Sequence, residues 1–161
     1  MWIISARTKI TLMKLYTDAT FTWQKYANND EKILKGKICI ITEDNAEHPL
    51  NVIEEVIVGR VEGLKQYINI YELIAVARAI ELAKEKGWDD IQIFTDSSVA
   101  KMWANKGVSA TPFTEAHRSC QEYITKVKKA EHGGKIEIGH VLRDQNPAGK
   151  LLEIELEKSK L

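Results

Sequence analysis

Two aspartates follow the same local pattern at distant places in the chain. Asp18 ends an aromatic-Thr-Asp sequence over residues 16–18, and Asp96 ends another over residues 94–96. Each follows an apolar stretch typical of a buried strand, in which successive side chains point to opposite faces. Two strands that both end in this way place two carboxylates side by side if they pair in one sheet. The repeated pattern therefore predicts a pair of neighbouring carboxylates.

A third acid, Glu72, lies near the start of a predicted helix. Apolar residues recur after Ile70 at intervals of three and four, as in a helix packed on a sheet. Glu72 projects over this apolar face, where a carboxylate is costly to bury without a partner. The structural alternative is a capping box, with Asn69 as the N-cap and Glu72 at the third helical position. Asp96 has a similar alternative as a cap of the helix that follows it.

Taken together, the three carboxylates indicate a cation site. Acids that are forced together repel one another and take up protons unless a cation bridges them. A cluster of oxygen ligands suits Mg²⁺ or Mn²⁺ and not zinc, which prefers nitrogen and sulfur. Two such ions about 3.5–4 Å apart can activate a water and stabilise a leaving oxygen in phosphodiester hydrolysis. Asp18, Glu72 and Asp96 are therefore the candidate metal ligands.

The elements that would position these acids form an α/β pattern. We expect strands over about residues 11–17, 37–42, 52–58, 91–94 and 135–141, and helices over 70–86, 97–104, 114–129 and from 146 towards the C-terminus. Three strands followed by strand–helix units favour a mixed sheet with helices on its faces. Residues 21–35 are polar, carry an Asn-Asn-Asp turn signal at 28–30, and are expected to connect the first two strands. No repeat or linker divides the chain, so residues 1–161 are expected to form a single domain.

Composition excludes several classes of protein. Lysine plus arginine and aspartate plus glutamate number 23 each, so any binding of nucleic acid would need a local patch of charge. The two cysteines, Cys39 and Cys120, lack metal-ligand spacing, and Cys39 lies in an apolar run. A buried free thiol and a cytoplasmic location are expected. No segment has the length of a signal peptide's apolar region or of a membrane span, and no obligatory protein partner is indicated.

The order and spacing of four motifs resemble those of ribonuclease H. The motifs are residues 16–18, residues 69–73, residues 94–97, and His140 with Asn146 six positions later. The resemblance covers about residues 12–155. It implies a five-stranded mixed sheet of order 3-2-1-4-5, with the first three strands antiparallel and helices at its sides. It also implies up to two Mg²⁺ or Mn²⁺ ions and hydrolysis of the RNA strand of an RNA–DNA hybrid, leaving 5′-phosphate and 3′-hydroxyl ends.

By the same resemblance, individual residues acquire expected roles. The metal ions would be held by Asp18, Glu72 and Asp96. His140 would assist proton transfer or product release from a mobile loop. Substrate would be contacted by Asn69, which is expected to reach the hybrid's riboses, and by Ser97 and Asn146. Recognition of the ribose 2′-OH is what separates RNA from DNA.

The chain departs from the family pattern at one ligand position. Four residues after Asn146, where the family usually has a fourth carboxylate, the chain has Lys150. A cation there competes electrostatically with a metal ion. Glu153 and Asp144 are the nearby acids that could supply the missing charge, although neither has the expected spacing. Two alternatives follow: a non-catalytic nucleic-acid-binding or interaction module with a degenerate metal site, or a hydrolase of this fold with another nucleic-acid substrate.

Overall fold

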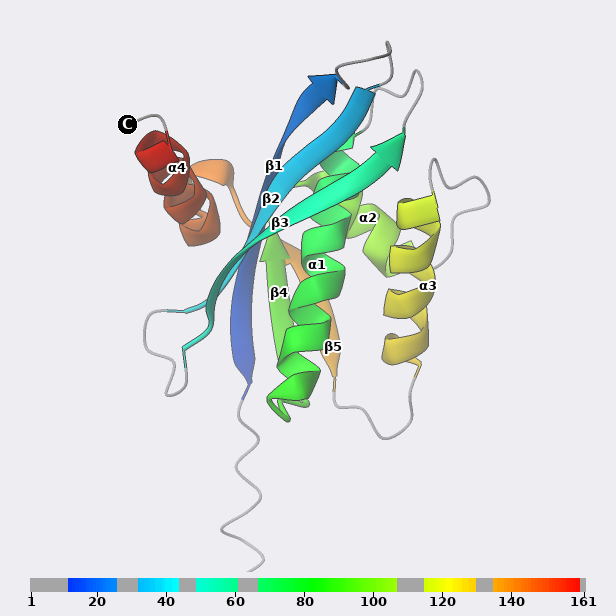
Figure 1. The fold of residues 1–161 in the computed structure, drawn as a ribbon. Helices are drawn as coiled ribbons and strands as arrows, with labels where there is room; N and C mark the ends of the chain where they lie inside the picture. The colour runs from blue at the N-terminus through cyan, green and yellow to red at the C-terminus, as the bar shows by residue number, and fades with distance from the viewer. Residues whose placement is uncertain are drawn as a thin grey trace, which may run out of the picture.

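The computed structural model describes residues 12–25, 32–43, 49–60, 67–106, 115–129 and 135–159, which form a five-stranded sheet flanked by helices (Figure 1). The strands are β1 (Met13–Lys25), β2 (Lys32–Thr42), β3 (Asn51–Arg60), β4 (Ile91–Thr95) and β5 (Ile136–His140). Their order is β3-β2-β1-β4-β5. Strands β1, β2 and β3 pair antiparallel, whereas β4 pairs parallel to β1 and β5 parallel to β4. The predicted mixed sheet, its strand order and its antiparallel first half are therefore confirmed.

Helices cover both faces of this sheet. They are α1 (Tyr67–Glu85), α2 (Ser98–Lys106), α3 (Glu115–Lys128) and α4 (Pro147–Ser159), with a short 3₁₀ turn, η2 (Arg143–Gln145), before α4. Helix α1 crosses one face, with α2 and α3 beyond it, and α4 lies on the other side (Figure 1). No helix in the described ranges is long and apolar enough to cross a bilayer.

Alternation along β1 divides its side chains between two cores. Leu15 and Ala19 belong to the larger core that includes α1, while Tyr16 packs against the smaller cluster formed by Cys39, Ala148 and Leu152. A strand repeats every two residues, so the face of Tyr16 is also the face of the residue two positions on, Asp18. The start of α4 therefore packs on the strand face that carries this carboxylate.

Strand β1 is longer than the sequence pattern indicated. It was expected to end at residue 17, with a connection over 21–35, but β1 pairs with β2 from Leu15–Thr42 to Lys25–Lys32. The antiparallel ladder uses backbone groups, so it continues through polar residues that give no apolar alternation. The predicted turn at 28–30 lies outside the described residues. Asp18 consequently lies in the middle of β1 and not at its end.

Candidate metal centre

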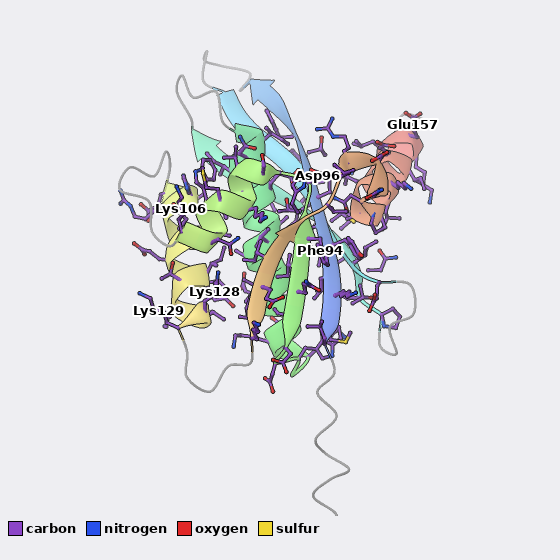
Figure 2. The ribbon with its side chains drawn as sticks, turned by 180° about the vertical axis from the view of Figure 1, so that it is seen from behind. Phe94, Asp96, Lys106, Lys128, Lys129 and Glu157 are labelled. Atoms are coloured by element: carbon purple, nitrogen blue, oxygen red, sulfur yellow. The ribbon has the colours of Figure 1, made fainter. Side chains whose placement is uncertain are left out.

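The structure brings three carboxylates from distant parts of the chain together. Asp18 comes from β1, Glu72 from α1, and Asp96 directly follows β4. Each offers one oxygen, and these oxygens lie within 4.8 Å of one another. Asp96 lies just beyond the end of β4 (Figure 2). The sequence pattern had predicted this convergence.

The parallel register of β1 and β4 explains the meeting of the two aspartates. Thr17 lies opposite Thr95, the last pair of this ladder, and each threonine is followed by an aspartate. The Thr17 hydroxyl donates a hydrogen bond of 3.4 Å to the carbonyl of Phe94. One position earlier, the rings of Tyr16 and Phe94 stack with centroids 5.3 Å apart. The repeated aromatic-Thr-Asp pattern thus aligns across the two strands.

Glu72 is the most enclosed member of the cluster. It is 3% exposed, and its Oε2 atom has no hydrogen-bond partner among the described residues. Burial, and then the nearby charge of Asp18, raise the pKa of Glu72 well above its usual range. The capping-box interpretation is wrong, because α1 begins at Tyr67 and Asn69 already lies inside the first turn. An orphaned carboxylate oxygen beside two aspartates fits a bound cation.

The Asp18 carboxylate responds to several neighbours. Burial raises its pKa, a hydrogen bond with Glu72 lowers it, and the charge of Asp96 raises it again. Arg143, on η2, acts in the opposite sense and lowers the pKa of Asp18. The net direction is upward. Without a cation, the cluster therefore favours protonation, as expected for carboxylates forced together.

Asn146 connects the acidic cluster to α4. Its side chain is fully buried, and its Nδ2 donates to the Thr17 carbonyl at 2.9 Å and to Asp96 Oδ2 at 3.2 Å. Its Oδ1 accepts the backbone N–H of Ala148 at 3.1 Å, which caps the start of α4. Both ends of the amide are engaged inside the protein. In this position Asn146 orients Asp96, and its contact with substrate stays a prediction.

Asn69 and Ser97 form a second polar pair beside Asp96. The Ser97 hydroxyl donates to Asn69 Oδ1 at 2.9 Å and accepts the backbone N–H of Ala100 at 3.0 Å. The cap of α2 is therefore Ser97, which leaves the Asp96 carboxylate for the cluster. Both polar side chains remain partly exposed. This position is compatible with the predicted contacts to substrate.

His140 is the last residue of β5 and lies opposite Thr95 in the sheet. Its side chain is exposed. His140 lies in the strand that was predicted over residues 135–141 and not in the mobile loop that the resemblance implied, because the ladder with β4 extends as far as this residue. His140 therefore stands at the edge where β4 delivers Asp96, although it does not line the cleft described next.

A cleft of about 840 Å³ opens beside Asp18 and Glu72. Its far wall comes from η2 and α4 and carries Arg143, Asp144, Lys150 and Glu153. The predicted fourth ligand position, Lys150, thus faces the same cleft as the acids. Among the described residues, only the first three acids form the close cluster, and Glu153 and Asp144 lie outside it.

Gly149 allows the α4 wall to approach Asp18 closely. A Cβ atom at this position would lie 2.9 Å from Asp18 Oδ2, so any other residue would displace the carboxylate. Sequence reasoning missed both Gly149 and Arg143. Gly149 adjoins the motif at Asn146 and Lys150, which was the available signal. Arg143 had no signal in its spacing.

Comparisons with known proteins bear on the fold. No protein-family model matches the chain, and no curated protein matches it in sequence. The chain is similar in structure to RNase H1 from the halophilic archaeon Halobacterium salinarum NRC-1, with 18% identity, a TM-score of 0.55, and coverage of 92% of this chain and 99% of that one. A second similar structure is LC11-RNase H1 in complex with an RNA/DNA hybrid, with 16% identity, a TM-score of 0.55, and coverage of 87% and 92%.

A third similar structure is the protease-reverse transcriptase of prototype foamy virus. Its identity is 16% and its TM-score 0.59, and the match covers 88% of this chain but 20% of the viral one. The similarity to the viral protein is therefore confined to one part of it. At these identities, the three matches describe a shared arrangement of strands and helices.

Proposed function

We propose that this chain, which has the ribonuclease H fold, is a divalent-metal-dependent endonuclease that hydrolyses the RNA strand of RNA–DNA hybrids. One observation carries the proposal. Glu72 is buried, has one oxygen without a hydrogen-bond partner among the described residues, and lies close to Asp18 and Asp96. Asp18 and Glu72 also line an open cleft. Such a group of acids is unfavourable in itself and becomes favourable when a divalent cation binds it.

Asp18, Glu72 and Asp96 would hold up to two Mg²⁺ or Mn²⁺ ions. The chemistry that such ions would supply there is a lowered pKa of a water for attack on phosphorus and stabilisation of the leaving 3′-oxygen. The protein's part is to hold the three carboxylates in place. Asn146 fixes Asp96 through a hydrogen bond of 3.2 Å, and Gly149 leaves room for Asp18. Preorganised ligands of this kind need no rearrangement when the ion and substrate arrive.

The remaining roles concern the substrate. Exposed His140, at the end of β5, would transfer a proton or assist product release. Asn69 and Ser97, joined at 2.9 Å beside Asp96, would contact the hybrid and its 2′-hydroxyls. We place the protein in the cytoplasm, because Cys39 and Cys120 are both free thiols.

The alternative is a nucleic-acid-binding module without catalysis. Lys150 favours it, because this cation lines the cleft where a fourth carboxylate was expected. A binding module would retain hybrid with no requirement for metal, whereas the nuclease requires Mg²⁺ or Mn²⁺ for turnover.

A cleavage assay separates the two functions. An end-labelled RNA–DNA hybrid, with matched RNA and DNA duplexes as controls, is incubated with the protein in Mg²⁺, in Mn²⁺ and in excess EDTA. We expect metal-dependent cutting of the RNA strand of the hybrid, and its loss in Asp18→Asn. Asp89→Asn removes an exposed carboxylate from the segment between α1 and β4 and serves as the matched control. Intact hybrid at micromolar protein in both metals would exclude the nuclease.

A further inference from the structure

The cleft beside the acidic cluster is lined by two cations, Arg143 and Lys150, together with two further acids, Asp144 and Glu153. Asp18 of β1 and Glu72 of α1 line it, as do Arg143 of η2 and Lys150 of α4. The cleft is large, at about 840 Å³. A ligand that occupies this cleft therefore lies near the acids and near the two cations.

Arg143 differs from the other arginines whose side chains are described. Arg78 makes an ion pair of 2.8 Å with Glu54, and Arg118 makes one of 3.4 Å with Glu115. Arg143 is exposed and makes no ion pair or side-chain hydrogen bond with any described residue, although its charge acts on Asp18 at longer range. Lys150 is likewise exposed and unpaired within the described ranges. Both cations are available to an incoming anion.

We propose that Arg143 binds a backbone phosphate of the nucleic acid in the cleft, and that Lys150 supplies a second contact from the same wall. This inference rests on the proposed function and adds a residue to it. The planar guanidinium presents two parallel N–H groups that match two phosphate oxygens, whereas an ammonium acts as a point charge. Arg143 is therefore the main contact.

The charge balance of the site supports this assignment. Three ionised carboxylates with one divalent ion retain a net negative charge, and a phosphodiester is negative as well. The substrate would then be repelled at the position where it must react. Arg143 and Lys150 offset this repulsion where they lie, whereas Asp144 and Glu153, which line the same cleft, add to it. The same cations weaken metal binding somewhat, since Arg143 already stabilises the charge of Asp18.

The structural explanation for Arg143 is that it only balances Asp18. If Arg143 acts only on the Asp18 carboxylate, its substitution should not change how the binding of nucleic acid depends on salt concentration. A phosphate contact releases a counterion, so its loss lowers the slope of log K against log salt by about 0.9 for a duplex. The salt slope therefore distinguishes the two explanations.

The test measures binding of a short fluorescein-labelled RNA–DNA hybrid by fluorescence anisotropy over a series of NaCl concentrations, in Mg²⁺. An Asp96→Asn background keeps the hybrid intact. In this background we compare three test substitutions, Arg143→Gln, Arg143→Lys and Lys150→Gln. Arg118→Gln, on α3, is the matched control. We expect Arg143→Gln to weaken binding roughly tenfold or more and to reduce the slope by about one contact. Arg143→Lys should keep the slope and recover part of the affinity.

Lys150→Gln should also reduce the salt slope, but with a smaller loss of affinity for the hybrid than Arg143→Gln. Arg118→Gln should change neither the slope nor the affinity. Mn²⁺ affinity, measured by calorimetry on Arg143→Gln with Asp96 restored, should be kept or slightly raised, which would show that the site is still assembled. If Arg143→Gln matches Arg118→Gln in affinity and slope, the phosphate contact is wrong.

A parallel cleavage assay with Asp96 restored separates this inference from the proposed function. Cleavage of the hybrid combined with an unchanged slope in Arg143→Gln would overturn the phosphate contact alone. A reduced slope with no cleavage by the unaltered protein would uphold the contact and overturn the nuclease. If the unaltered protein neither binds nor cuts the hybrid, both are overturned.

Discussion

The amide of Asn146 donates to the carboxylate of Asp96 at 3.2 Å, from a side chain that is fully buried. The same Nδ2 reaches the Thr17 carbonyl at 2.9 Å, one residue before Asp18. A single side chain at the start of α4 thus contacts both strands that deliver aspartates. The integrity of the acidic cluster and the docking of α4 are consequently coupled.

Replacement of Asn146 by alanine should therefore affect stability and the site together. It leaves the Thr17 carbonyl unsatisfied and removes the cap of α4. We expect the free energy of unfolding to fall by about 2–4 kcal/mol, as the sum of a lost cap and a buried unpaired group. Urea denaturation measures this loss, and Gln145→Ala, at the exposed neighbour, is the control. A loss below about 0.5 kcal/mol, typical of surface positions, would contradict the buried role of Asn146.

Glu72→Gln should separate stability from metal binding. Burial and the Asp18 charge make the ionised Glu72 unfavourable, so a neutral amide should stabilise the metal-free protein at neutral pH. The gain is about 1.4 kcal/mol for each pH unit above the ordinary pKa of 4.5, and it stops growing once the pH exceeds the folded-state pKa. The same change should abolish the rise in Tm that Mn²⁺ produces in the unaltered protein. Thermal denaturation with and without Mn²⁺ tests both effects, and a destabilised metal-free variant would argue against this assignment.

The metal-free protein should lose stability as the pH rises. The folded-state pKa of Glu72 is raised above its ordinary value of 4.5, so above that pH the folded state holds more protons than the unfolded state. Protonated Glu72 therefore contributes fully to the free energy of unfolding below pH 4.5, and this contribution is lost as the pH rises through the pKa of Glu72 in the folded state. Saturating Mn²⁺ should remove this decline, because metal ligands are deprotonated. Urea titrations across pH 4.5–8 should show the steepest decline in the metal-free, unaltered protein and a weaker one in Glu72→Gln, because burial also raises the pKa of Asp18.

Gly149→Ala should impair the site without unfolding the protein. Its Cβ would lie 2.9 Å from Asp18 Oδ2, a flexible carboxylate that can move aside. Alanine favours a helix over glycine by up to about 1 kcal/mol, so stability should be kept or increased. The affinity for Mn²⁺ should fall severalfold, as measured by calorimetry. Unchanged affinity would mean that Asp18 is not held in place by α4.

Lys150→Asp should raise the affinity for Mn²⁺. The substitution exchanges a cation for a carboxylate on the wall that faces Asp18. A change of about 1.4 kcal/mol in the electrostatic energy already gives a tenfold effect, so a tenfold or greater increase is expected. Glu153→Gln serves as the comparison. If it lowers metal affinity while Lys150→Asp has no effect, Glu153 already provides the additional charge.

Much of the fold followed from periodicity in the sequence. The meeting of Asp18 and Asp96 was predictable because one local pattern occurs on two strands that pair in register. The length of β1 was not predicted. Its extension to Lys25 depends on backbone pairing with β2. The start of α1 was placed too late for the same kind of reason, as a plausible cap at Asn69 lies within the helix.

The parts of the site that escaped prediction depend on contacts among three or more segments. The inward orientation of Asn146 requires β1, β4 and α4 to be in place at once. Arg143 faces the cleft because η2 turns the chain between β5 and α4. Contacts among several segments leave no pattern in the spacing of nearby residues, whereas strands and helices leave a hydrophobic period.

The attachment of α4 to β1 through Asn146 has a consequence for synthesis of the protein. The first described strand provides Asp18, and the last described helix provides the clamp that orders the aspartates. A nascent polypeptide that is still held by the ribosome short of this helix has its acids but not their final arrangement. The final arrangement of the three acids would thus be reached only after translation has passed α4.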